Sequence, residues 1–374
     1  MHIGIDASRI TTKQRTGTEN YTYNLIKALA EVDRSNHYTL YFNHIPAIPP
    51  VSHANFSNKS IPLPRFWTQA RLATELFRES PDLLFIPAHT LPILRPRTLK
   101  TVVTIHDLGV EYLKEYHQFP HKLYLGKSTT YASKHADGII AVSESTKRDL
   151  IAKLGTPEEK IQVIYEGFDS KIFYPRDSKE VSKIKEKLNI KGDYLLFVGT
   201  IQPRKNLLRL IQAFSNYLAH TKKGDIQLII AGKKGWLYED ILLAPARLNI
   251  DDKVKFVGHV GDSDLPALYS GASAFLFPSL YEGFGLPLLE AFASKIPVLT
   301  SNISSLPEVA GEAALKVDPN STTQITEALD QIITNDKLRQ QLISDSQLQL
   351  KKFSWKKCAQ ETLAFLEKVA REKK

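Results

Sequence analysis

Short apolar runs that alternate with longer, helically periodic polar stretches constrain the fold of this chain more than any other feature. The first series is Ile3–Ile5, Tyr38–Phe42, Leu83–Pro87, Val102–His106, Gly138–Ser143 and Gln162–Tyr165, and the second is Tyr194–Val198, Gln227–Ala231, Val254–Val257, Ala274–Phe277, Pro297–Thr300 and Ala314–Val317. Continuous apolar runs are typical of parallel strands that are covered on both faces. Two such series therefore predict two doubly wound α/β domains.

The break between the two series should lie at Phe173–Ser178. A proline in this segment ends an extended stretch, and the charged run Ser178–Lys187 then predicts a helix. No long flexible linker separates the series, so we expect two facing domains, residues 1–175 and 176–354, with a cleft between them. Apolar residues at helical spacing over Trp355–Val369 predict one long final helix.

Composition excludes several classes of protein. The 374 residues carry a formal net charge of +9, divided into +4 over residues 1–175 and +5 over residues 176–374. This even distribution is unlike a nucleic-acid-binding arm, so we expect no nucleic-acid partner. The only cysteine, Cys358, excludes a disulfide framework and a cysteine-cluster metal site.

The sequence also indicates where the protein works. The N-terminal residues resemble a short buried strand and not a signal peptide, and no apolar run approaches 18 residues. A single cysteine agrees with a reducing compartment. We therefore expect a cytoplasmic protein, and association with an acidic membrane surface on the cytoplasmic side stays open.

The densest group of polar and glycine residues is Ser279–Ala291, which follows an apolar run that ends in a proline. Gly283 and Gly285 predict a turn that a ligand can approach closely, and a helix should begin near Leu286. The N–H groups and the dipole at a helix start favour an anion such as a diphosphate. The pattern predicts an anion site at this loop.

Two glutamates flank the same loop. We expect Glu290 in the first turn of the helix, where its carboxylate could accept hydrogen bonds from two ribose hydroxyls. Glu282 lies before the turn and could meet the hydroxyls of a second sugar. The alternative is a plain glycine turn with acidic residues that stabilise the helix start, and the pattern alone gives both interpretations similar weight.

A second constellation, Val198–Leu207, comes at the end of the first strand of the second series. Arg204 and Lys205 lie at the mouth of the expected sheet, just before a helix, which suits a phosphate clamp. Taken alone, a solvated basic turn explains these two residues better.

The first series offers two weaker signals. His106 and Asp107 end a strand, so the histidine could hydrogen-bond a sugar hydroxyl with Asp107 orienting it, although a structural turn is the commoner explanation. Gly17 lies in the segment Thr16–Asn20 after the first strand, where a glycine loop often meets a ligand. Ordinary helix capping by Thr18 competes with that interpretation.

Two further charged segments favour structural explanations. Asp262 and Asp264 resemble a paired-carboxylate metal clasp, but they precede the helical run Leu265–Tyr269, so capping of that helix explains them more simply. The basic and aromatic stretch Lys114–Lys134 could form an acceptor groove or a membrane-facing patch, and a solvated helix face is the favoured alternative.

These motifs, in this order, resemble retaining glycosyltransferase family 4, which has the GT-B fold of two facing Rossmann-like domains. The motifs that carry the resemblance are Gly17, Ile105–Asp107, Ile140–Ser143, Val163–Asp169, Phe173–Pro175, Val198–Thr200, Arg204–Asn206, Ile229–Gly232, Val254–Gly258 and Pro278–Glu290. Glu282 and Glu290, eight positions apart around Gly-Phe-Gly-Leu-Pro, are the most specific of them. The resemblance covers nearly the whole chain.

The resemblance implies a role for each matching residue of the second domain. Glu290 would bind the ribose of a nucleotide sugar, and Lys205 would neutralise its diphosphate. Glu282 would hold the donor sugar. The backbone from Gly283 through Phe284 and Gly285 to Leu286 would hold the sugar and the diphosphate, as part of a set completed by Gly199, Thr200 and Val260, the last beside the base.

The resemblance also extends to the first domain. His106 would face the donor sugar, and Gly17 would let its loop approach the phosphates. The final helix, residues 355–374, would cross back onto the first domain. No metal or other cofactor is expected, because cationic side chains and a helix start would stabilise the departing diphosphate.

One position departs from the family pattern. Many members have an arginine directly after the glycine that Gly199 matches, and Thr200 stands there in this chain. Arg204, beside Lys205, could supply the second positive charge. This variant of the motif resembles a mannosyl- or rhamnosyltransferase subgroup, so we take GDP-mannose as the expected donor.

The resemblance therefore predicts transfer of a hexose from a nucleotide sugar to a glycan or lipid-linked sugar acceptor, in the assembly of a cell-surface polysaccharide. Two alternatives remain. A GT-B sugar-nucleotide 2-epimerase would convert the donor without any acceptor. A non-catalytic two-domain sugar-binding protein would be indifferent to the nucleotide.

Overall fold

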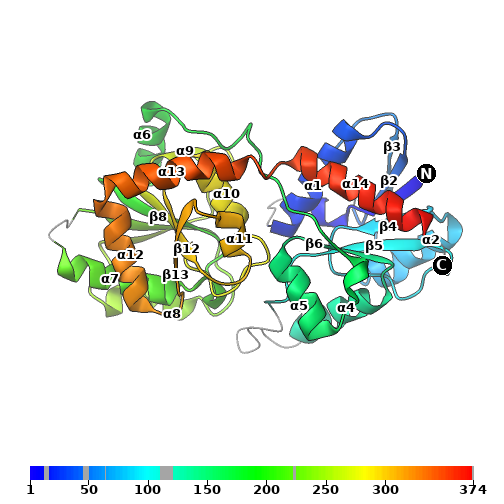
Figure 1. Cartoon of the computed structure of the whole chain (residues 1–374), viewed down its shortest axis with the longest axis horizontal. Coiled ribbons are helices and arrows are strands. Elements are labelled where there is room, and N and C mark those ends of the chain that lie inside the picture. Colours follow the sequence, from blue (N-terminus) through cyan, green and yellow to red (C-terminus); the bar gives the residue numbers. More distant parts are fainter. Residues whose placement is uncertain (12–16, 45–49, 64, 110–120, 222–224, 373–374) are drawn as a thin grey trace. The chain divides into compact units, whose positions relative to one another are not determined.

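A computed structural model describes residues 1–11, 17–44, 50–63, 65–109, 121–221, 225–372, and it divides the chain into two compact units (Figure 1). The first unit contains residues 1–167 together with 353–374, and the second contains residues 168–352. The chain thus passes into the second unit between Gly167 and Phe168, earlier than the expected break after Pro175. It returns to the first unit at Phe353, just before the final helix.

The first unit is built on a seven-stranded parallel sheet with the strand order β3-β2-β1-β4-β5-β6-β7. The strands are β1 (His2–Asp6), β2 (His37–Phe42), β3 (Phe56–Ser60), β4 (Leu83–Ile86), β5 (Lys100–Ile105), β6 (Gly138–Ala141) and β7 (Ile161–Val163). Every residue of β4, β5 and β6 is buried, as continuous apolar runs predict for central parallel strands. The six predicted strands of this unit are confirmed, with ends that shift by one or two residues.

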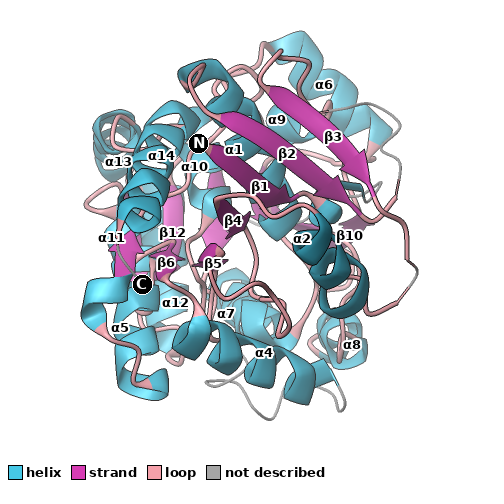
Figure 2. Ribbon diagram, turned by 90° about the vertical axis from the view of Figure 1, so that its right-hand side faces the viewer, coloured by secondary structure: helices cyan, strands magenta, loops and turns pink. Residues whose placement is uncertain are grey.

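Strand β3 has no counterpart among the predicted strands. After Phe56 its sequence to Ser60 is polar, and none of its residues is fully buried. It pairs only with β2 and forms an edge of the sheet, where Figure 2 shows it beside β2 and β1. An edge strand that lacks cover carries no apolar run, so the pattern that identifies the other strands misses it.

Helices cover the faces of this sheet. They are η1 (Ser8–Thr11), α1 (Gly17–Val32), η2 (Thr68–Leu72), α2 (Ala73–Arg78), α4 (His121–His135), α5 (Glu144–Leu154), η4 (Glu158–Lys160) and α14 (Trp355–Arg371). The final helix α14 packs against α1, β4 and β5. A Cβ added to Gly138 at the start of β6 would lie 2.8 Å from Val369 Cγ2 and 2.9 Å from Phe365 Cζ, so the glycine permits this close packing.

The second unit is built on a six-stranded parallel sheet with the order β10-β9-β8-β11-β12-β13. Its strands are β8 (Tyr194–Val198), β9 (Gln227–Ala231), β10 (Val254–Gly258), β11 (Ala274–Phe277), β12 (Val298–Ser301) and β13 (Ala314–Val317). Its helices are α6 (Ser178–Lys187), η5 (Pro203–Lys205), α7 (Leu207–His220), α8 (Glu239–Arg247), α9 (Leu265–Ser270), α10 (Leu286–Ala293), α11 (Leu306–Ala310), α12 (Thr322–Thr334) and α13 (Asp336–Leu350). All six predicted strands and the predicted helix Ser178–Lys187 are confirmed.

The strand order places a switch point in each sheet. In the second unit the chain moves from β8 to β9 on one side and later returns to β11 on the other side of β8. Ligands of doubly wound folds bind at the carboxyl ends of the strands that flank such a point, here β8 and β11. Among the described residues no helix is long and apolar enough to cross a membrane.

Candidate active site

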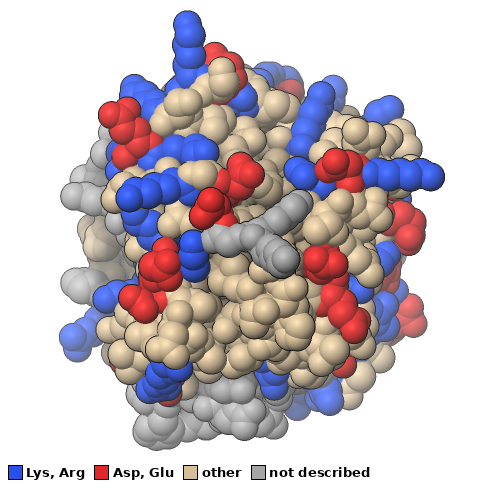
Figure 3. All heavy atoms as spheres, turned by 90° about the vertical axis from the view of Figure 1, so that its left-hand side faces the viewer, with Lys and Arg blue, Asp and Glu red and all other residues tan. Residues whose placement is uncertain are grey.

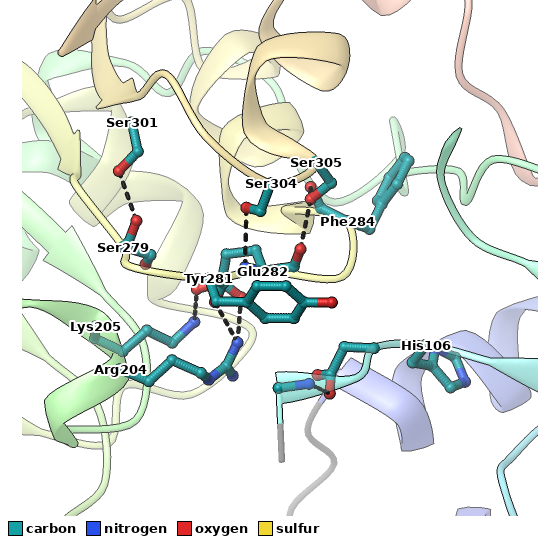
Figure 4. Close-up of polar contacts among 12 residues, drawn as sticks. His106, Arg204, Lys205, Ser279, Tyr281, Glu282, Phe284, Ser301, Ser304 and Ser305 are labelled. Atoms are coloured by element: carbon teal, nitrogen blue, oxygen red, sulfur yellow. Dashed lines mark hydrogen bonds and ion pairs between the residues drawn. The ribbon is translucent and has the colours of Figure 1, made fainter. Parts of the chain in front are cut away.

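One buried carboxylate joins the two loops at the switch point of the second unit. Lys205 donates from Nζ to Glu282 Oε1 at 2.6 Å, and Arg204 donates from Nη1 to Glu282 Oε2 at 3.0 Å (Figure 4). Arg204 also donates to the carbonyl oxygen of Tyr281 at 2.7 Å. The two cations follow β8 and the carboxylate follows β11, so the structure brings together three of the predicted site residues.

The environment of Glu282 keeps it ionised. Burial acts to raise the pKa of Glu282, but the charges of Arg204 and Lys205 and the hydrogen bond from Lys205 outweigh it and lower the pKa. Lys205 is equally enclosed, with its Nζ 4.6 Å from the centre of the Phe277 ring. Removing one partner of such a buried pair leaves the other charge uncompensated, so the three side chains hold one another in place.

Serine hydroxyls from the next strand–helix loop fix the Glu282 loop. Ser304 Oγ accepts the backbone N–H of Glu282 at 3.1 Å, and Ser305 Oγ donates to the carbonyl oxygens of Glu282 at 2.9 Å and Phe284 at 2.8 Å. Ser301 Oγ donates to the carbonyl oxygen of Ser279 at 2.6 Å. The backbone of residues 279–284 is therefore anchored along its length (Figure 4).

Asn206 fixes the other loop. It adopts the left-handed conformation with φ 60° between η5 and α7. Its side-chain amide donates to the carbonyl oxygens of Pro278 at 3.0 Å and Pro319 at 2.7 Å, so it ties the end of η5 to the residue after β11. Asparagine tolerates this backbone conformation better than most residues, which explains its place directly after the two cations.

Glycines permit close backbone contact beside the cations. A Cβ added to Gly232 would lie 1.9 Å from the carbonyl oxygen of Gly199, and both residues have positive φ. One added to Gly235 would lie 2.8 Å from Thr200 Cγ2. Thr200, which stands where many family members have arginine, thus packs beside Gly235, and Arg204 and Lys205 bind the same carboxylate.

Gly285 turns the loop into helix α10. Its φ of 117° is open to glycine and strained for other residues, and a Cβ there would lie 2.9 Å from Leu306 Cδ2. The helix begins at Leu286, as predicted, with Pro287 in its first turn. Glu290 is the fifth helical residue, so the expectation that it lies in the first turn is wrong by one position.

Glu290 is held by a tyrosine that sequence reasoning missed. Tyr269, at the end region of α9, is fully buried and donates its hydroxyl to Glu290 Oε2 at 2.9 Å. Burial raises the pKa of Glu290 to about 7; the Tyr269 hydrogen bond lowers it and the charge of Asp262 raises it further. Glu290 therefore changes charge near neutral pH.

The acidic pair beside this helix has a different role from the one expected. Asp264 precedes α9, but its side chain makes no capping hydrogen bond. Instead its Oδ2 lies 2.5 Å from Lys187 Nζ at the end of α6. The capping interpretation of Asp264 is wrong, because the ion pair with a neighbouring helix takes its carboxylate. Val260, predicted to line the base pocket, is buried in the loop between β10 and α9.

In the first unit, His106 follows β5 and is almost fully buried. Its Nε2 lies 3.0 Å from the carbonyl oxygen of Pro87 and its Nδ1 lies 3.3 Å from Glu166 Oε1. We expected Asp107 to orient this ring, and that is wrong, since Glu166 and Pro87 hold both ring nitrogens. The carboxylate of Asp107 accepts the backbone N–H of Gly109 at 3.0 Å.

A second histidine, His89, supports the loop after β5. The backbone N–H of His106 donates to His89 Nε2 at 3.0 Å, and His89 Nδ1 lies 3.1 Å from Thr129 Oγ1. Burial lowers the pKa of His89 to about 4, and the neighbouring His106 lowers it as well. His89 is therefore neutral at pH 7 and can accept that backbone hydrogen bond.

The glycine signal near the N-terminus is only partly within the described residues. Gly17 is the first residue of α1, and a Cβ added there would meet no atom within 4 Å. Thr18 lies inside the helix, so it is not the capping residue we considered. Residues 12–16 lie outside the described part of the chain, as do residues 114–120 of the basic Lys114–Lys134 stretch.

Family models match both units. Residues 15–171 match the model "Glycosyltransferase Family 4", and residues 178–349 match "Glycosyl transferases group 1". The chain is 31% identical over 367 residues to the O-antigen chain mannosyltransferase B of Escherichia coli, and the alignment covers 93% of this chain and 95% of that relative. This chain belongs to glycosyltransferase family 4.

A second relative, the serotype-specific mannosyltransferase WbdA of Escherichia coli, is 30% identical over 72% of this glycosyltransferase and 33% of its own length. Among solved structures, sucrose-phosphate synthase from Thermosynechococcus elongatus aligns with a TM-score of 0.78 at 19% identity, over 98% of each chain. Anabaena HepE in complex with UDP and glucose aligns with a TM-score of 0.74 at 17% identity, over 98% and 99%. The GT-B fold class is confirmed, and the glycosyltransferase is similar in sequence to mannosyltransferases.

Proposed function

We propose that this glycosyltransferase is a retaining enzyme that moves mannose from GDP-mannose to a glycan or lipid-linked sugar during assembly of a cell-surface polysaccharide. The resemblance of its motifs and its similarity to O-antigen mannosyltransferases support the substrate class. The observation that carries the proposal is the buried Arg204–Glu282–Lys205 cluster at the carboxyl ends of β8 and β11. Two adjacent cations at a switch point are suited to the diphosphate of a nucleotide sugar.

The cations would act on the leaving group. As the bond between the anomeric carbon and the diphosphate oxygen breaks, negative charge develops on that oxygen, and Lys205 and Arg204 would stabilise it. The acceptor hydroxyl would attack from the same face, and its proton would pass to the departing phosphate oxygen. The products are the glycoside and a nucleoside diphosphate. Glu282, released in part from its cations, would accept hydrogen bonds from the donor sugar.

Glu290 would bind the ribose. An ionised carboxylate can accept two hydrogen bonds from neighbouring hydroxyls, and Tyr269 holds one of its oxygens in place. The backbone from Gly283 to Leu286, Gly199 and Thr200 would complete the donor site, with Val260 beside the base. In the first unit, His106 would face the donor sugar and Gly17 would let its loop approach the phosphates, as the family resemblance implies.

The proposed location is the cytoplasmic face of a membrane, where a lipid-linked acceptor would be available. A nucleic-acid partner is not part of the proposal, because the charges of the chain are mixed. On the face shown in Figure 3, lysines and arginines alternate with aspartates and glutamates and form no continuous basic surface. A nucleic-acid site needs a basic patch or stripe.

A thermal-shift panel of nucleoside diphosphates and nucleotide sugars tests the donor. A ligand that binds the folded state raises its melting temperature, so GDP and GDP-mannose should give the largest shifts. Transfer to a mannose-terminated acceptor, with the new linkage analysed by NMR, then tests retention: the anomeric configuration of the product should match that of the donor.

Two outcomes would favour the alternatives. Conversion of the nucleotide sugar to an epimer with no acceptor present would indicate a 2-epimerase. Binding of free sugar without any response to nucleoside diphosphates would indicate a sugar-binding protein. If neither GDP nor GDP-mannose stabilises the protein but UDP or dTDP does, the donor assignment is wrong and the transferase assignment stands.

A further inference from the structure

Four large apolar side chains of the first unit lie open to solvent. Phe66 is 78% exposed, Leu94 67%, Phe77 62% and Ile93 59%. All four fall within one stretch of 29 residues that contains only η2, α2 and β4 and their loops. Single exposed apolar residues are common on soluble proteins, whereas a group of them marks a surface that contacts something else. We refer to these four residues as the Phe66 patch.

The two segments that form the patch are tied together. Gln69, in η2, donates from Nε2 to the carbonyl oxygen of Leu91 at 3.0 Å, and its Oε1 accepts the backbone N–H of Ile93 at 2.9 Å. The carbonyl oxygen of Phe66 accepts the N–H of Ala70, the residue after Gln69. The segment that begins at Phe66 and the segment that contains Ile93 are thus joined by a single amide side chain.

The helix extends the patch. Ala70 in η2, and Thr74 and Phe77 in α2, follow one another at helical spacing. Phe66 precedes η2 by two positions, and Figure 2 shows α2 at the front of the first unit. Phe66 and Phe77 stand at the two ends of this row, with the small exposed residues Ala70 and Thr74 between them. The row is therefore a shallow stripe with an aromatic side chain at each end.

The conformation of Phe66 is strained. Its φ of 56° lies in the left-handed region, which costs a non-glycine residue about 1 kcal/mol or more. The next residue, Trp67, is buried and its Nε1 donates to the carbonyl oxygen of Ile61 at 2.8 Å. Trp67 is thus anchored inside the unit, whereas the ring of Phe66 beside it is exposed among the described residues.

The second segment is held equally firmly. Arg95 donates from Nη1 to the carbonyl oxygen of Pro92 at 2.8 Å and from Nη2 to the carbonyl oxygen of His135 at 2.8 Å. These bonds fix the loop that carries Ile93 and Leu94 against the end of α4. The patch is thus preformed by specific hydrogen bonds.

The surroundings of the patch are basic. Residues 65–100 contain six cationic residues and three acidic ones, and Arg65, Arg78 and Arg97 are exposed. Of the acidic residues, Glu75 is buried and pairs with Lys59 at 2.8 Å and Arg71 at 3.1 Å, so its charge is already balanced within the unit. The other two, Glu79 and Asp82, are exposed, and Glu79 also pairs with Lys59, at 2.5 Å. The exposed charges of this stretch are therefore three arginines and two acidic residues, a net positive charge.

From this combination we propose that the Phe66 patch docks the protein onto an anionic lipid bilayer. The four side chains of the Phe66 patch would enter the boundary between headgroups and acyl chains, and the exposed arginines would contact lipid phosphates. Charge complementarity selects the bilayer as the occupant, because exposed cations around apolar side chains suit an anionic, partly apolar surface. The inference rests on the proposed function only in that a lipid-linked acceptor would lie in such a membrane.

Co-sedimentation of the full chain with vesicles tests the proposal. Binding to phosphatidylcholine vesicles that contain 30% phosphatidylglycerol should be at least tenfold stronger than binding to pure phosphatidylcholine. The double variant F66S/L94S should lose at least tenfold in binding to the anionic vesicles. The matched control L243S/L348S removes two leucines of the second unit that are 51% and 61% exposed, and it should bind like the wild type.

Charge is tested separately. R65Q/R97Q should weaken binding to anionic vesicles at least threefold, and 0.5 M NaCl should narrow the difference between this variant and the wild type. Equal binding of F66S/L94S and the wild type would overturn the proposal. The proposal would also fail if the wild type did not bind vesicles but dimerised with increasing concentration, and F66S/L94S abolished that dimerisation. The patch would then contact a second copy of the chain.

The membrane proposal and the proposed function fail in different ways. F66S/L94S should keep the wild-type melting temperature and the wild-type thermal shift with nucleoside diphosphate, which shows that its loss of vesicle binding is not a loss of folding. If the wild type binds anionic vesicles but transfers no sugar, the proposed function fails and the docking surface stands. If it transfers sugar to a water-soluble acceptor but ignores vesicles, the reverse holds.

Discussion

The charge of Glu290 should make nucleotide binding depend on pH. Burial raises the pKa of this carboxyl to about 7, so roughly half of the free protein holds it protonated at neutral pH. Only the carboxylate can accept hydrogen bonds from two ribose hydroxyls through both of its oxygens. Affinity for a nucleoside diphosphate should therefore rise as the pH increases through 7 and level off near pH 8.

The magnitude follows from the shift. If the carboxylate form alone binds, the dissociation constant increases about tenfold for each pH unit below 7, which is about 100-fold, or about 2.7 kcal/mol, at pH 5. The difference between the ordinary pKa of 4.5 and a value of about 7 corresponds to about 3 kcal/mol. This is the cost of holding the charge in its buried position, and the ribose hydroxyls would offset part of it.

Isothermal titration calorimetry with the nucleoside diphosphate from pH 5 to pH 9 measures the profile. E290Q is the matched control, since it keeps the shape of the side chain and cannot ionise, and any titration of the ligand phosphate appears in both proteins. The ratio of the two dissociation constants should carry the whole pH dependence of Glu290.

Substitution of Tyr269 and of Asp262 should shift the pH midpoint of nucleotide binding in opposite directions. Y269F removes the hydrogen bond that lowers the pKa of Glu290, so the midpoint should rise. D262N removes a negative charge that raises this pKa, so the midpoint should fall. A constant ratio between wild type and E290Q across the range would refute the reasoning, as would shifts of the same sign in Y269F and D262N.

Three further changes test the rest of the structure. K205A should lower kcat/KM at least tenfold, about 1.4 kcal/mol of transition-state stabilisation, whereas K357A on the exposed side of α14 should leave it unchanged in the same transfer assay. G232A should destabilise the second unit by about 2 kcal/mol or more, because its Cβ would lie 1.9 Å from a carbonyl oxygen, while G261A, with nothing within 4 Å, should leave the midpoint of urea unfolding almost unchanged. D33N should cost the first unit about 2 kcal/mol of stability at pH 7. Burial raises the pKa of Asp33, but hydrogen bonds from Tyr38 and neighbouring residues lower it to about 2. The stabilisation by Asp33 is therefore present above pH 4 and disappears as the pH falls towards 2, which urea unfolding at several pH values would show. Equal stability of D33N and wild type at pH 7 would contradict that account.

The central strands, and the positions of the site motifs along the sequence, could be predicted because their signals are local. A strand buried on both faces must be apolar along its whole length, which made β4, β5 and β11 visible in the sequence. The same logic fails for β3, whose polar residues lie at an edge. The partial membrane signal at Lys114–Lys134 rested on composition alone, and the exposed residues around Phe66 became visible only once burial was known.

Partners across the fold could not be predicted. Tyr269 precedes Glu290 by 21 positions, and Glu166 follows His106 by 60, and nothing in their local sequence indicates that they meet. Ser304 and Ser305 lie after a different strand from the loop that they fix. Each of these contacts depends on which strands become neighbours in the sheet. Local sequence patterns, such as periodicity and turn signals, contain no information about that strand order.

The amino-acid sequence by itself determined the two α/β domains, because backbone periodicity is a property of short segments. Its motifs also resembled the family that the comparisons then showed, and the residues of the candidate donor site stay predictions from that resemblance. The tertiary structure alone decided that Glu282 pairs with both Arg204 and Lys205, that burial raises the pKa of Glu290 to about 7 and that His106 is held by Glu166. Charge states and hydrogen-bond partners depend on burial and on distances between segments, and these arise only when the chain has folded.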